Sequence, residues 1–254
     1  MNKTGISWTD LTWNPVSGCS KVSPGCQNCY AEALSKRWGR SFDVTLHPEK
    51  IKEVKKIPSG SKVFVNSMSD LFHENVRFDF IDQVFYAIEL RPDVVFQILT
   101  KRPERLIHYF KRDWKIYTWK HPLGNPIPKN IWFGVSVELE LYAERIAQLR
   151  AMRNEPLYIQ NNLFVSFEPL LGDIEGVDLS EISWIIIGGE SGPHHRSMKT
   201  EWARNLVRQA KDQGVAVWMK QLGGFRPGGE LEDFPEDLRI REFPKEIRND
   251  QDLS

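Results

Sequence analysis

The chain has 254 residues, of which 41% are hydrophobic and 27% are charged, and its 34 basic residues balance its 34 acidic ones. This composition indicates a globular protein with one large or two small domains, and neutrality excludes a global attraction to nucleic acid. The first residues lack the apolar core of a signal peptide, and no apolar run approaches the roughly 20 residues that span a bilayer. We therefore expect a cytoplasmic protein without a membrane partner, in a reducing setting where clustered cysteines indicate metal binding or catalysis.

Apolar, β-branched segments alternate with helical patterns along the whole chain. After a first strand before Cys19, the strands are predicted at residues 62–66, 94–99, 131–135, 163–167, 184–187 and 215–219. Helices are predicted at residues 30–38, 78–90, from 103 onward, 141–152 and 201–213. Apolar strands that alternate with helices form parallel sheets covered on both faces. About seven such units predict an α/β fold, a full or partial (β/α) barrel.

All the cysteines lie in one Gly/Pro-rich segment near the N-terminus. Cys19, Cys26 and Cys29 have the spacing C-x6-C-x2-C. Thiolates are soft metal ligands, and electron-carrying four-iron clusters use four of them. Three thiolates leave one iron of a [4Fe-4S] cluster open, and S-adenosylmethionine (SAM) can chelate such an iron through its amine and carboxylate.

Zinc is the alternative metal for this segment. A structural zinc site is normally closed by four ligands, so His47, His73 or an aspartate would have to add the fourth. A disulfide is less favoured because the number of cysteines is odd.

Polar residues follow the predicted strands at the point where each strand ends. In barrels this end carries the active site, because its loops converge above the strands. Each residue alone is equally well explained as a helix cap or a solvated loop residue. The set comprises Asn66, Ser67, Asp70, Thr100, Lys101, Arg102, Ser136, Glu138, Glu168, Glu190, Lys220 and Gln221.

The segment at residues 184–192 (WIIIGGESG) ends in a glycine pair. Gly188 and Gly189 allow a ligand to approach the backbone closely, and Glu190 then projects into the mouth of the barrel. Neither glycine-rich phosphate-binding motif is complete, so nucleotide-phosphate binding has little support. His194 and His195 could contact metal or substrate, although adjacent loop histidines are more often simply exposed.

Residues 101–121, from Lys101 to His121, carry seven Lys/Arg against two acidic residues, with five aromatic residues interleaved. Basic groups that contact phosphates and rings that stack on bases are typical of a groove for single-stranded nucleic acid. The alternative, which we weigh more heavily, is an amphipathic helix whose aromatic residues face the core.

The last residues differ in composition from the rest. Residues 228–254 hold nine acidic residues against four basic ones, which indicates a loosely ordered tail. We expect a barrel domain at residues 1–225 and an acidic C-terminal appendage at residues 226–254.

Seven sequence blocks, spread over residues 6–224, resemble a phage and mobile-element family of unassigned function. They are SWTDLTWNPVSGCSKVSPGCQNCYAE, KVFVNSMSDLFHE, FQILTKRPERL, IWFGVSVE, FVSFEPLLG, WIIIGGESGPHHRSM and VWMKQLGG. That family is similar to the radical SAM superfamily and is sometimes found beside a three-Cys-motif partner protein. The resemblance implies a radical-SAM-like barrel with a [4Fe-4S] cluster on Cys19, Cys26 and Cys29.

The superfamily's usual spacing is C-x3-C-x2-C, with an aromatic residue before the last cysteine. Here Asn28 precedes Cys29, and the aromatic residue, Tyr30, follows it. Tyr30 is expected to bind the cofactor, and by strand order Asn66, Ser67 and Asp70 would contact the methionine part of SAM. Ser136 and Glu138 would contact its ribose.

The function we expect is therefore that of a radical SAM enzyme, in which the cluster takes an electron from an external donor and cleaves SAM to a 5′-deoxyadenosyl radical. Glu168, Glu190, Lys101 and Arg102 would orient a substrate or move protons, and a nucleic acid or nucleotide is the preferred substrate. Two alternatives stay open: a zinc-stabilised nucleic-acid-binding protein without enzymatic activity, and an iron–sulfur protein of this fold that no longer cleaves SAM.

Overall fold

The structure of the protein is a computed structural model that describes residues 2–112, 127, 129–154, 160–226 and 231–244. One eight-stranded sheet forms its centre, in the order β1-β2-β5-β6-β7-β8-β9-β10. The strands are β1 (Asn2–Lys3), β2 (Leu11–Trp13), β5 (Lys62–Val65), β6 (Val95–Thr100), β7 (Ile131–Ser136), β8 (Leu163–Phe167), β9 (Trp184–Gly188) and β10 (Ala216–Gln221).

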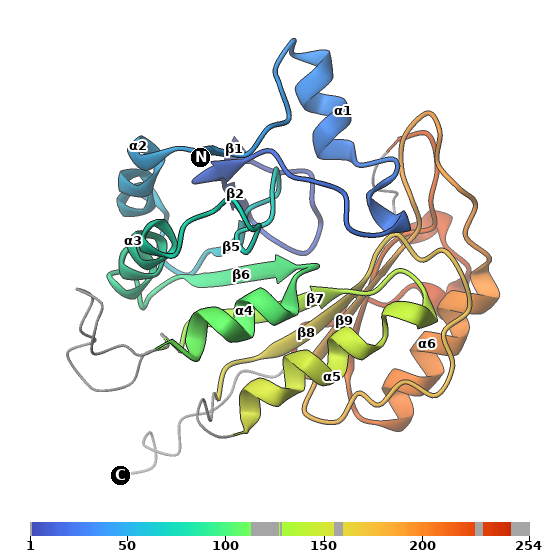
Figure 1. The fold of residues 1–254 in the computed structure, drawn as a ribbon. Helices are drawn as coiled ribbons and strands as arrows, with labels where there is room; N and C mark the ends of the chain where they lie inside the picture. Colours follow the sequence, from blue (N-terminus) through green and yellow to red (C-terminus); the bar gives the residue numbers. More distant parts are fainter. Residues whose placement is uncertain (1, 113–126, 128, 155–159, 227–230, 245–254) are drawn as a thin grey trace.

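Seven of these strands are parallel, and β1 runs antiparallel to β2 at one edge. Within the described residues β1 and β10 end the order, so the sheet curves without closing (Figure 1). The predicted α/β class and the partial (β/α) barrel are thus confirmed. The edge strand β1 and a small antiparallel pair, β3 (Val16–Ser17) with β4 (Thr45–Leu46), were not predicted.

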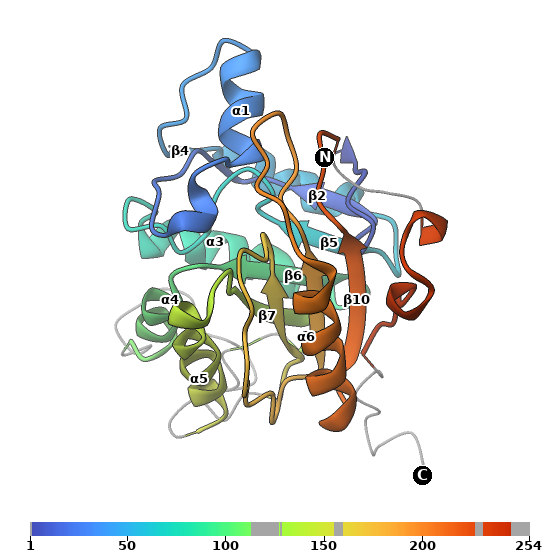
Figure 2. The same ribbon diagram turned by 90° about the vertical axis from the view of Figure 1, so that its right-hand side faces the viewer.

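The helices are α1 (Tyr30–Arg37), α2 (Pro48–Ile51), α3 (Phe78–Glu89), α4 (Pro103–Phe110), α5 (Glu144–Arg150) and α6 (Thr200–Asp212). Helices α3 to α6 cover the outer face of the sheet, whereas α1 projects from the body of the molecule (Figures 1 and 2). The helix predicted at residues 141–152 starts later, at Glu144, because Glu140–Tyr142 forms a 3-10 turn first.

The two faces of the sheet bury different side chains. The outer face packs aliphatic and phenylalanine residues against the helices. The inner face carries an aromatic cluster that includes Phe64, Trp132, Phe164, Trp184 and Trp218. Trp8, from the turn between β1 and β2, packs into this cluster and fills the amino end of the barrel. The aromatic cluster therefore fills the amino end of the barrel and does not extend to the carboxyl end.

Polar and small residues occupy the inner positions closer to the carboxyl end. Ser136 pairs in register with Ser166, and Gly134 pairs with Phe164. The Phe164 ring fills the space of the missing side chain, since a Cβ on Gly134 would lie 2.4 Å from its Cζ. The interior therefore changes from aromatic to polar along the strands.

The described part of the C-terminal segment, residues 231–244, is packed against the barrel. The amide of Met219 donates to the carbonyl of Ile240 at 2.8 Å, and Phe234 and Leu238 are buried. The expectation of loose order is wrong for these residues, because apolar side chains between the acids anchor them beside β10. The boundary between residues 225 and 226 stays a prediction.

No described helix is long and apolar enough to cross a membrane.

Candidate functional site

The cysteine loop, residues 18–29, joins β3 to α1 and lies at the carboxyl end of the barrel strands (Figure 1). Its first residue, Gly18, has φ +82°, and a Cβ there would lie 2.1 Å from the carbonyl oxygen of Asp43. The amides of Gly18 and Cys19 donate to the carbonyls of Met68 and Phe42. Only glycine therefore allows the chain to enter the loop along this path.

All three thiols are free and half-buried. Burial and the nearby Asp70 carboxylate raise the pKa of the Cys19 thiol to about 11, while the Arg102 guanidinium acts in the opposite direction. Among the described residues, no three His, Cys, Asp or Glu side chains are arranged to hold a metal ion together. The zinc alternative, with His47 or His73 as fourth ligand, is likewise not assembled in the described part of the chain.

Arg102, at the end of β6, holds the first part of the cysteine loop. Its Nη1 lies 3.5 Å from Cys19 Sγ, and its Nη2 donates to the carbonyl of Ser20 at 3.1 Å. The same guanidinium pairs with Asp70 at 3.1 Å and Glu74 at 3.1 Å, and Arg102 is only 8% exposed. One side chain thus links the strand end to the loop.

The Asp70 carboxylate is fully occupied in holding Arg102 in place. It accepts hydrogen bonds from the Thr100 hydroxyl at 2.8 Å and from the amides of Phe72 and Lys101, in addition to the Arg102 guanidinium. In this structure the Asp70 carboxylate positions Arg102, and its contact with a cofactor stays a prediction. Lys101 contributes its backbone amide to this network.

His73 and Ser20 extend the same network; His73 was considered only as a fourth zinc ligand, and Ser20 was given no role. The amide of Asn75 donates to His73 Nδ1 at 3.0 Å, so Nε2 carries the hydrogen that faces Ser20 Oγ at 2.8 Å. Burial, and then the nearby positive Arg102, lower the pKa of His73. The ring is thus kept neutral beside the loop.

Glu190, after β9, holds the last part of the cysteine loop. It accepts from Asn28 Nδ2 at 2.9 Å and pairs with the Arg196 guanidinium. Arg196 in turn donates to the carbonyl of Pro24 at 3.0 Å. Burial opposes ionisation of Glu190, but the hydrogen bonds from Arg196 and Asn28 bring its pKa below the usual value. Sequence reasoning found Glu190 but missed Arg196.

Glu138, after β7, lies against the middle of the loop. Its Oε1 accepts from the amide of Gly25 at 3.4 Å, and its Oε2 accepts from Arg145 at 3.0 Å. Arg145 also donates to the carbonyl of Ser136. Because Glu138 is fully buried and ion-paired, a Cβ on Gly25, 3.0 Å from its Cδ, would have nowhere to go.

Glu168 and Lys220 form an ion pair in the mouth of the barrel, apart from these loop contacts. Glu168 follows β8 and Lys220 lies on β10, so the pair spans the intervening strand β9. Gly188 on β9 leaves the room for it, since a Cβ there would lie 3.3 Å from Glu168 Cδ. The pair offers one acid and one base to a molecule bound in the mouth.

The predicted residues near β5 surround the start of α1. The Tyr30 hydroxyl donates to the carbonyl of Ser67, and the Ser67 hydroxyl bonds with Asn14. Asn66 is 2% exposed, and its Nδ2 has no hydrogen-bond partner among the described residues. A buried donor without a partner is costly, so this amide can stabilise an acceptor oxygen of a bound molecule.

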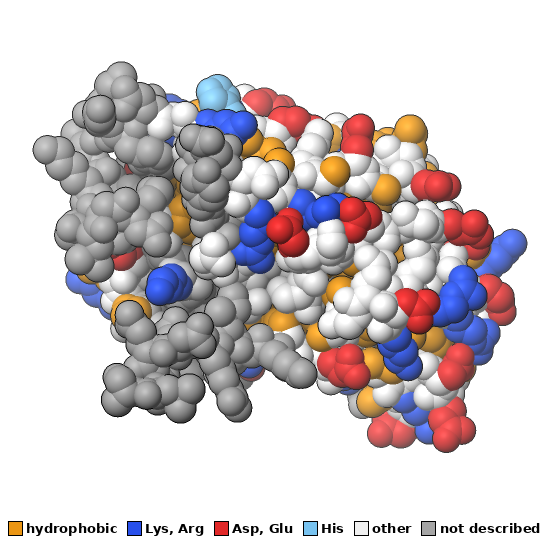
Figure 3. All heavy atoms as spheres, turned by 90° about the horizontal axis from the view of Figure 1, so that it is seen from below, with side chains coloured by type: hydrophobic (Ala, Val, Ile, Leu, Met, Phe, Trp, Pro, Cys, Tyr) orange, Lys and Arg blue, Asp and Glu red, His pale blue; other side chains and the backbone are white. Residues whose placement is uncertain are grey.

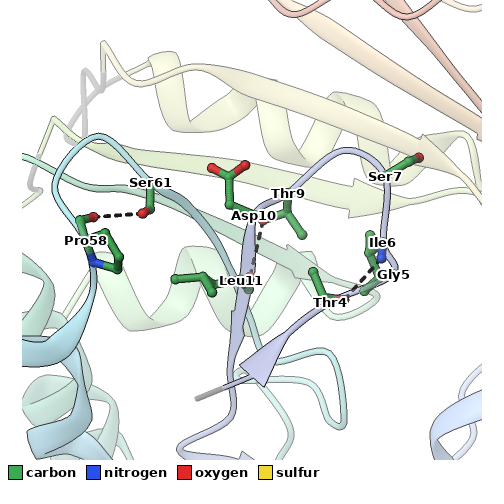
Figure 4. A pocket seen from close by; sticks show the side chains of 9 residues that line it. All are labelled: Thr4, Gly5, Ile6, Ser7, Thr9, Asp10, Leu11, Pro58 and Ser61. Atoms are coloured by element: carbon green, nitrogen blue, oxygen red, sulfur yellow. Dashed lines mark hydrogen bonds between the residues drawn. The ribbon is translucent and has the colours of Figure 1, made fainter.

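A separate hollow lies at the opposite, amino end of the barrel (Figure 4). Thr4, Ile6 and Ser7 line it from the β1–β2 turn, and Pro58 and Ser61 line it from the segment before β5. No predicted site residue takes part in it. The predicted site residues therefore lie at the carboxyl end of the barrel and not at this hollow.

Fold and site together define an α/β protein with a partial (β/α) barrel and a cysteine loop clamped across the carboxyl end of the strands. The chain belongs to the family described as "Protein of unknown function (DUF5131)", whose sequence profile matches residues 3–247. This agrees with the resemblance to a family of unassigned function. No curated protein matched the sequence.

Among solved structures, the chain is similar to a mutant of spore photoproduct lyase with bound AdoMet and dinucleoside spore photoproduct. The identity is 12% and the TM-score 0.50, with 83% of this chain and 63% of that chain covered. The same lyase complexed with dinucleoside spore photoproduct gives 12% identity and a TM-score of 0.46, with the same coverage. The chain thus spans less than two thirds of those proteins, and the likeness shows a shared fold.

Proposed function

We propose that this protein is a radical SAM enzyme whose [4Fe-4S] cluster is held by Cys19, Cys26 and Cys29. The observation that carries the proposal is the cysteine loop itself. Side chains from the ends of β6, β7 and β9 hold it over the carboxyl end of the barrel, where barrel enzymes bind their reactants. Three thiolates are the donor set of a cluster with one open iron, and this loop carries three free thiols, which the described structure does not gather around one point.

The cluster would supply the electron that cleaves SAM to methionine and a 5′-deoxyadenosyl radical. The protein's own residues would prepare the site. Arg102 offers a hydrogen bond to the Cys19 sulfur, which stabilises the thiolate form and fixes its direction. Arg196 and Glu138 hold the turn that carries Cys26.

The residues predicted to contact SAM divide into two groups. Asn66, Tyr30 and Ser67 lie where the loop meets β5, and Asn66 has a donor to offer. The Glu138 carboxylate already has partners in Arg145 and Gly25, so we assign it to holding the loop, whereas Ser136 gives Arg145 only its backbone carbonyl and keeps its hydroxyl for a ligand. A group that already has strong partners gains little from a ligand.

Glu168 and Lys220 are the residues we propose to face the substrate. Both are largely buried, and neither is used by the cysteine loop in the contacts described above. A carboxylate and an ammonium in contact can exchange a proton with a bound molecule and fix its orientation. We assign Arg102 and Glu190, expected to be catalytic, to holding the cysteine loop that they contact.

The substrate class we propose is a nucleic acid or nucleotide. The solved structure with a TM-score of 0.50 has a dinucleoside bound, which supports this class for the shared fold. Tyr109 and Phe110, two of the aromatic residues in the predicted nucleic-acid segment, are buried and face the core. The amphipathic-helix alternative therefore holds for α4, and the rest of the Lys101–His121 segment beyond Arg112 lies outside the described residues. An external electron donor, a three-Cys-motif partner and a cytoplasmic, phage-related setting stay proposals.

Anaerobic reconstitution with iron, sulfide and a strong reductant tests the function. The proposal predicts brown protein with about four irons per chain and formation of 5′-deoxyadenosine when SAM is added. Colourless protein with a single zinc would contradict the proposal and support the zinc-stabilised, non-enzymatic alternative. Brown protein that forms no 5′-deoxyadenosine would show a cluster without SAM cleavage.

A further inference from the structure

The far end of α1 carries a compact group of basic and aromatic side chains, residues 36–40 (KRWGR), which we call the α1 tip. All five residues are exposed, and Trp38 is 55% exposed. Among the described residues no other tryptophan is exposed to this extent. Residues 36–42 contain three basic residues and no acidic one.

Local stability accounts for only part of this group. Lys36 pairs with Glu32 one turn earlier, at 2.7 Å, and cations at the end of a helix are favourable to its dipole. The Arg40 guanidinium lies 5.6 Å from the centre of the Trp38 ring. None of these contacts removes the Trp38 ring from water. An exposed ring flanked by basic side chains is the combination that stacks on bases and contacts phosphates.

The position of the α1 tip connects it with the cysteine loop. Helix α1 starts at Tyr30, directly after Cys29, and its eight residues span about 12 Å. The helix projects from the body beside the loop that carries His194, whose carbonyl accepts a hydrogen bond from Asn28 (Figures 1 and 2). A linear polymer bound at the α1 tip can therefore extend along α1 toward the carboxyl end of the barrel.

We propose that the α1 tip binds single-stranded nucleic acid, with Trp38 stacked on a base and with Arg37 and Arg40 against phosphates. Every base offers a flat face to an aromatic ring, and guanidinium groups such as those of Arg37 and Arg40 can bind the phosphates. The underside of the molecule differs, because red and blue side chains are intermixed over its described part (Figure 3). The inference deepens the proposed function, since it rests on a nucleic-acid substrate and names the surface that holds it.

Fluorescence anisotropy with a labelled 20-mer of deoxythymidine, with a uridine 20-mer in parallel, tests this surface. The whole chain is used without reductant or SAM. Trp38→Ala should weaken binding by about five- to a hundred-fold, the loss expected for one stacked base. The double variant R37A/R40A should also lower the slope of log affinity against log salt by about 1.4, because it removes two phosphate contacts.

Two matched controls separate stacking and charge from general surface effects. Tyr86→Ala removes an aromatic ring that is 51% exposed on α3. The double variant K55A/K56A removes two exposed positive charges near α2. Both should bind the oligonucleotides within about twofold of the unaltered protein, because the contacts proposed lie elsewhere.

The inference is overturned if the unaltered protein binds neither oligonucleotide, or if Trp38→Ala and R37A/R40A bind as the controls do. Because the assay contains no SAM, its failure is distinct from failure of the radical chemistry. Formation of 5′-deoxyadenosine with Trp38-independent binding would leave the proposed function in place and remove this surface.

Discussion

The Nη1 atom of Arg102 lies 3.5 Å from the Sγ atom of Cys19, and the same nitrogen donates to Asp70 Oδ2 at 3.1 Å. This contact joins the end of a barrel strand to the loop that we propose to hold a cluster. Arg102 is buried, and its described contacts are ion pairs and hydrogen bonds. The stability of the loop should therefore depend on this one side chain.

Replacing Arg102 by Gln should lower the free energy of unfolding by about 3–5 kcal/mol, because Asp70 would be left as a buried carboxylate without its cation. Urea unfolding followed by circular dichroism measures the change. The matched control is Arg77→Gln, which breaks an exposed pair with Asp79 and should cost less than about 1 kcal/mol. Equal effects of the two changes would contradict the positioning role of Arg102.

Gly25→Ala should lower the amount of iron bound per chain, with only a small effect on the free energy of unfolding. The added methyl group would lie 3.0 Å from the Cδ of Glu138, which cannot move because it is ion-paired with Arg145. The turn that carries Cys26 must then shift away from the strand ends. Iron per chain after anaerobic reconstitution is the measurement, with Gly5→Ala, where an added Cβ has nothing within 4 Å, as the control for handling. Full iron content in Gly25→Ala would show that the contact with Glu138 is dispensable.

Gly134→Ala should destabilise the fold by about 1–3 kcal/mol, the usual cost of overpacking a core. Its Cβ would lie 2.4 Å from the Phe164 ring, inside the barrel. Adding Phe164→Leu should recover part of the loss, because a smaller side chain makes room. Gly5→Ala, which has nothing within 4 Å, is the control and should be close to neutral. Thermal and urea unfolding of the four proteins would decide the point.

Glu190 should make the stability depend on pH in the acidic range. Its folded pKa is lower than its usual value of 4.5, so the folded state binds fewer protons than the unfolded state. The stability it contributes is therefore full above that value and is lost as pH falls through the folded pKa. Urea midpoints of the unaltered protein and Glu190→Gln should differ most near neutral pH and converge in acid. A difference that grows on acidification would have the wrong sign.

The sequence predicted the seven parallel strands because each is a short apolar run between helical patterns. Strand β8, Leu163–Phe167, was predicted to the residue, since all its side chains are buried and its flanks are polar. Helix α5 was placed less well. The pattern of apolar residues does not distinguish the 3-10 turn at Glu140–Tyr142 from the helix that follows.

The candidate site was found as a set, but the roles of its members were not. Glu138 and Glu190 were expected to meet a cofactor and a substrate, which stays a prediction, whereas their contacts with the cysteine loop were not foreseen. Arg196, the partner of Glu190, is six residues beyond it, in a loop whose path no periodicity predicts. The position of a strand end in the sequence predicts which residues reach the mouth of the barrel. The partner of each residue depends on the paths of loops, which the sequence pattern does not predict.

The central claim is that the cysteine loop holds a four-iron cluster with one iron free for SAM. Electron paramagnetic resonance of the reconstituted, reduced protein, recorded with and without SAM, tests it most directly. The account predicts a cluster signal that changes when SAM binds the open iron, and loss of the signal in each of the variants C19A, C26A and C29A. A signal that SAM leaves unchanged, or protein that binds zinc and no iron, would contradict it.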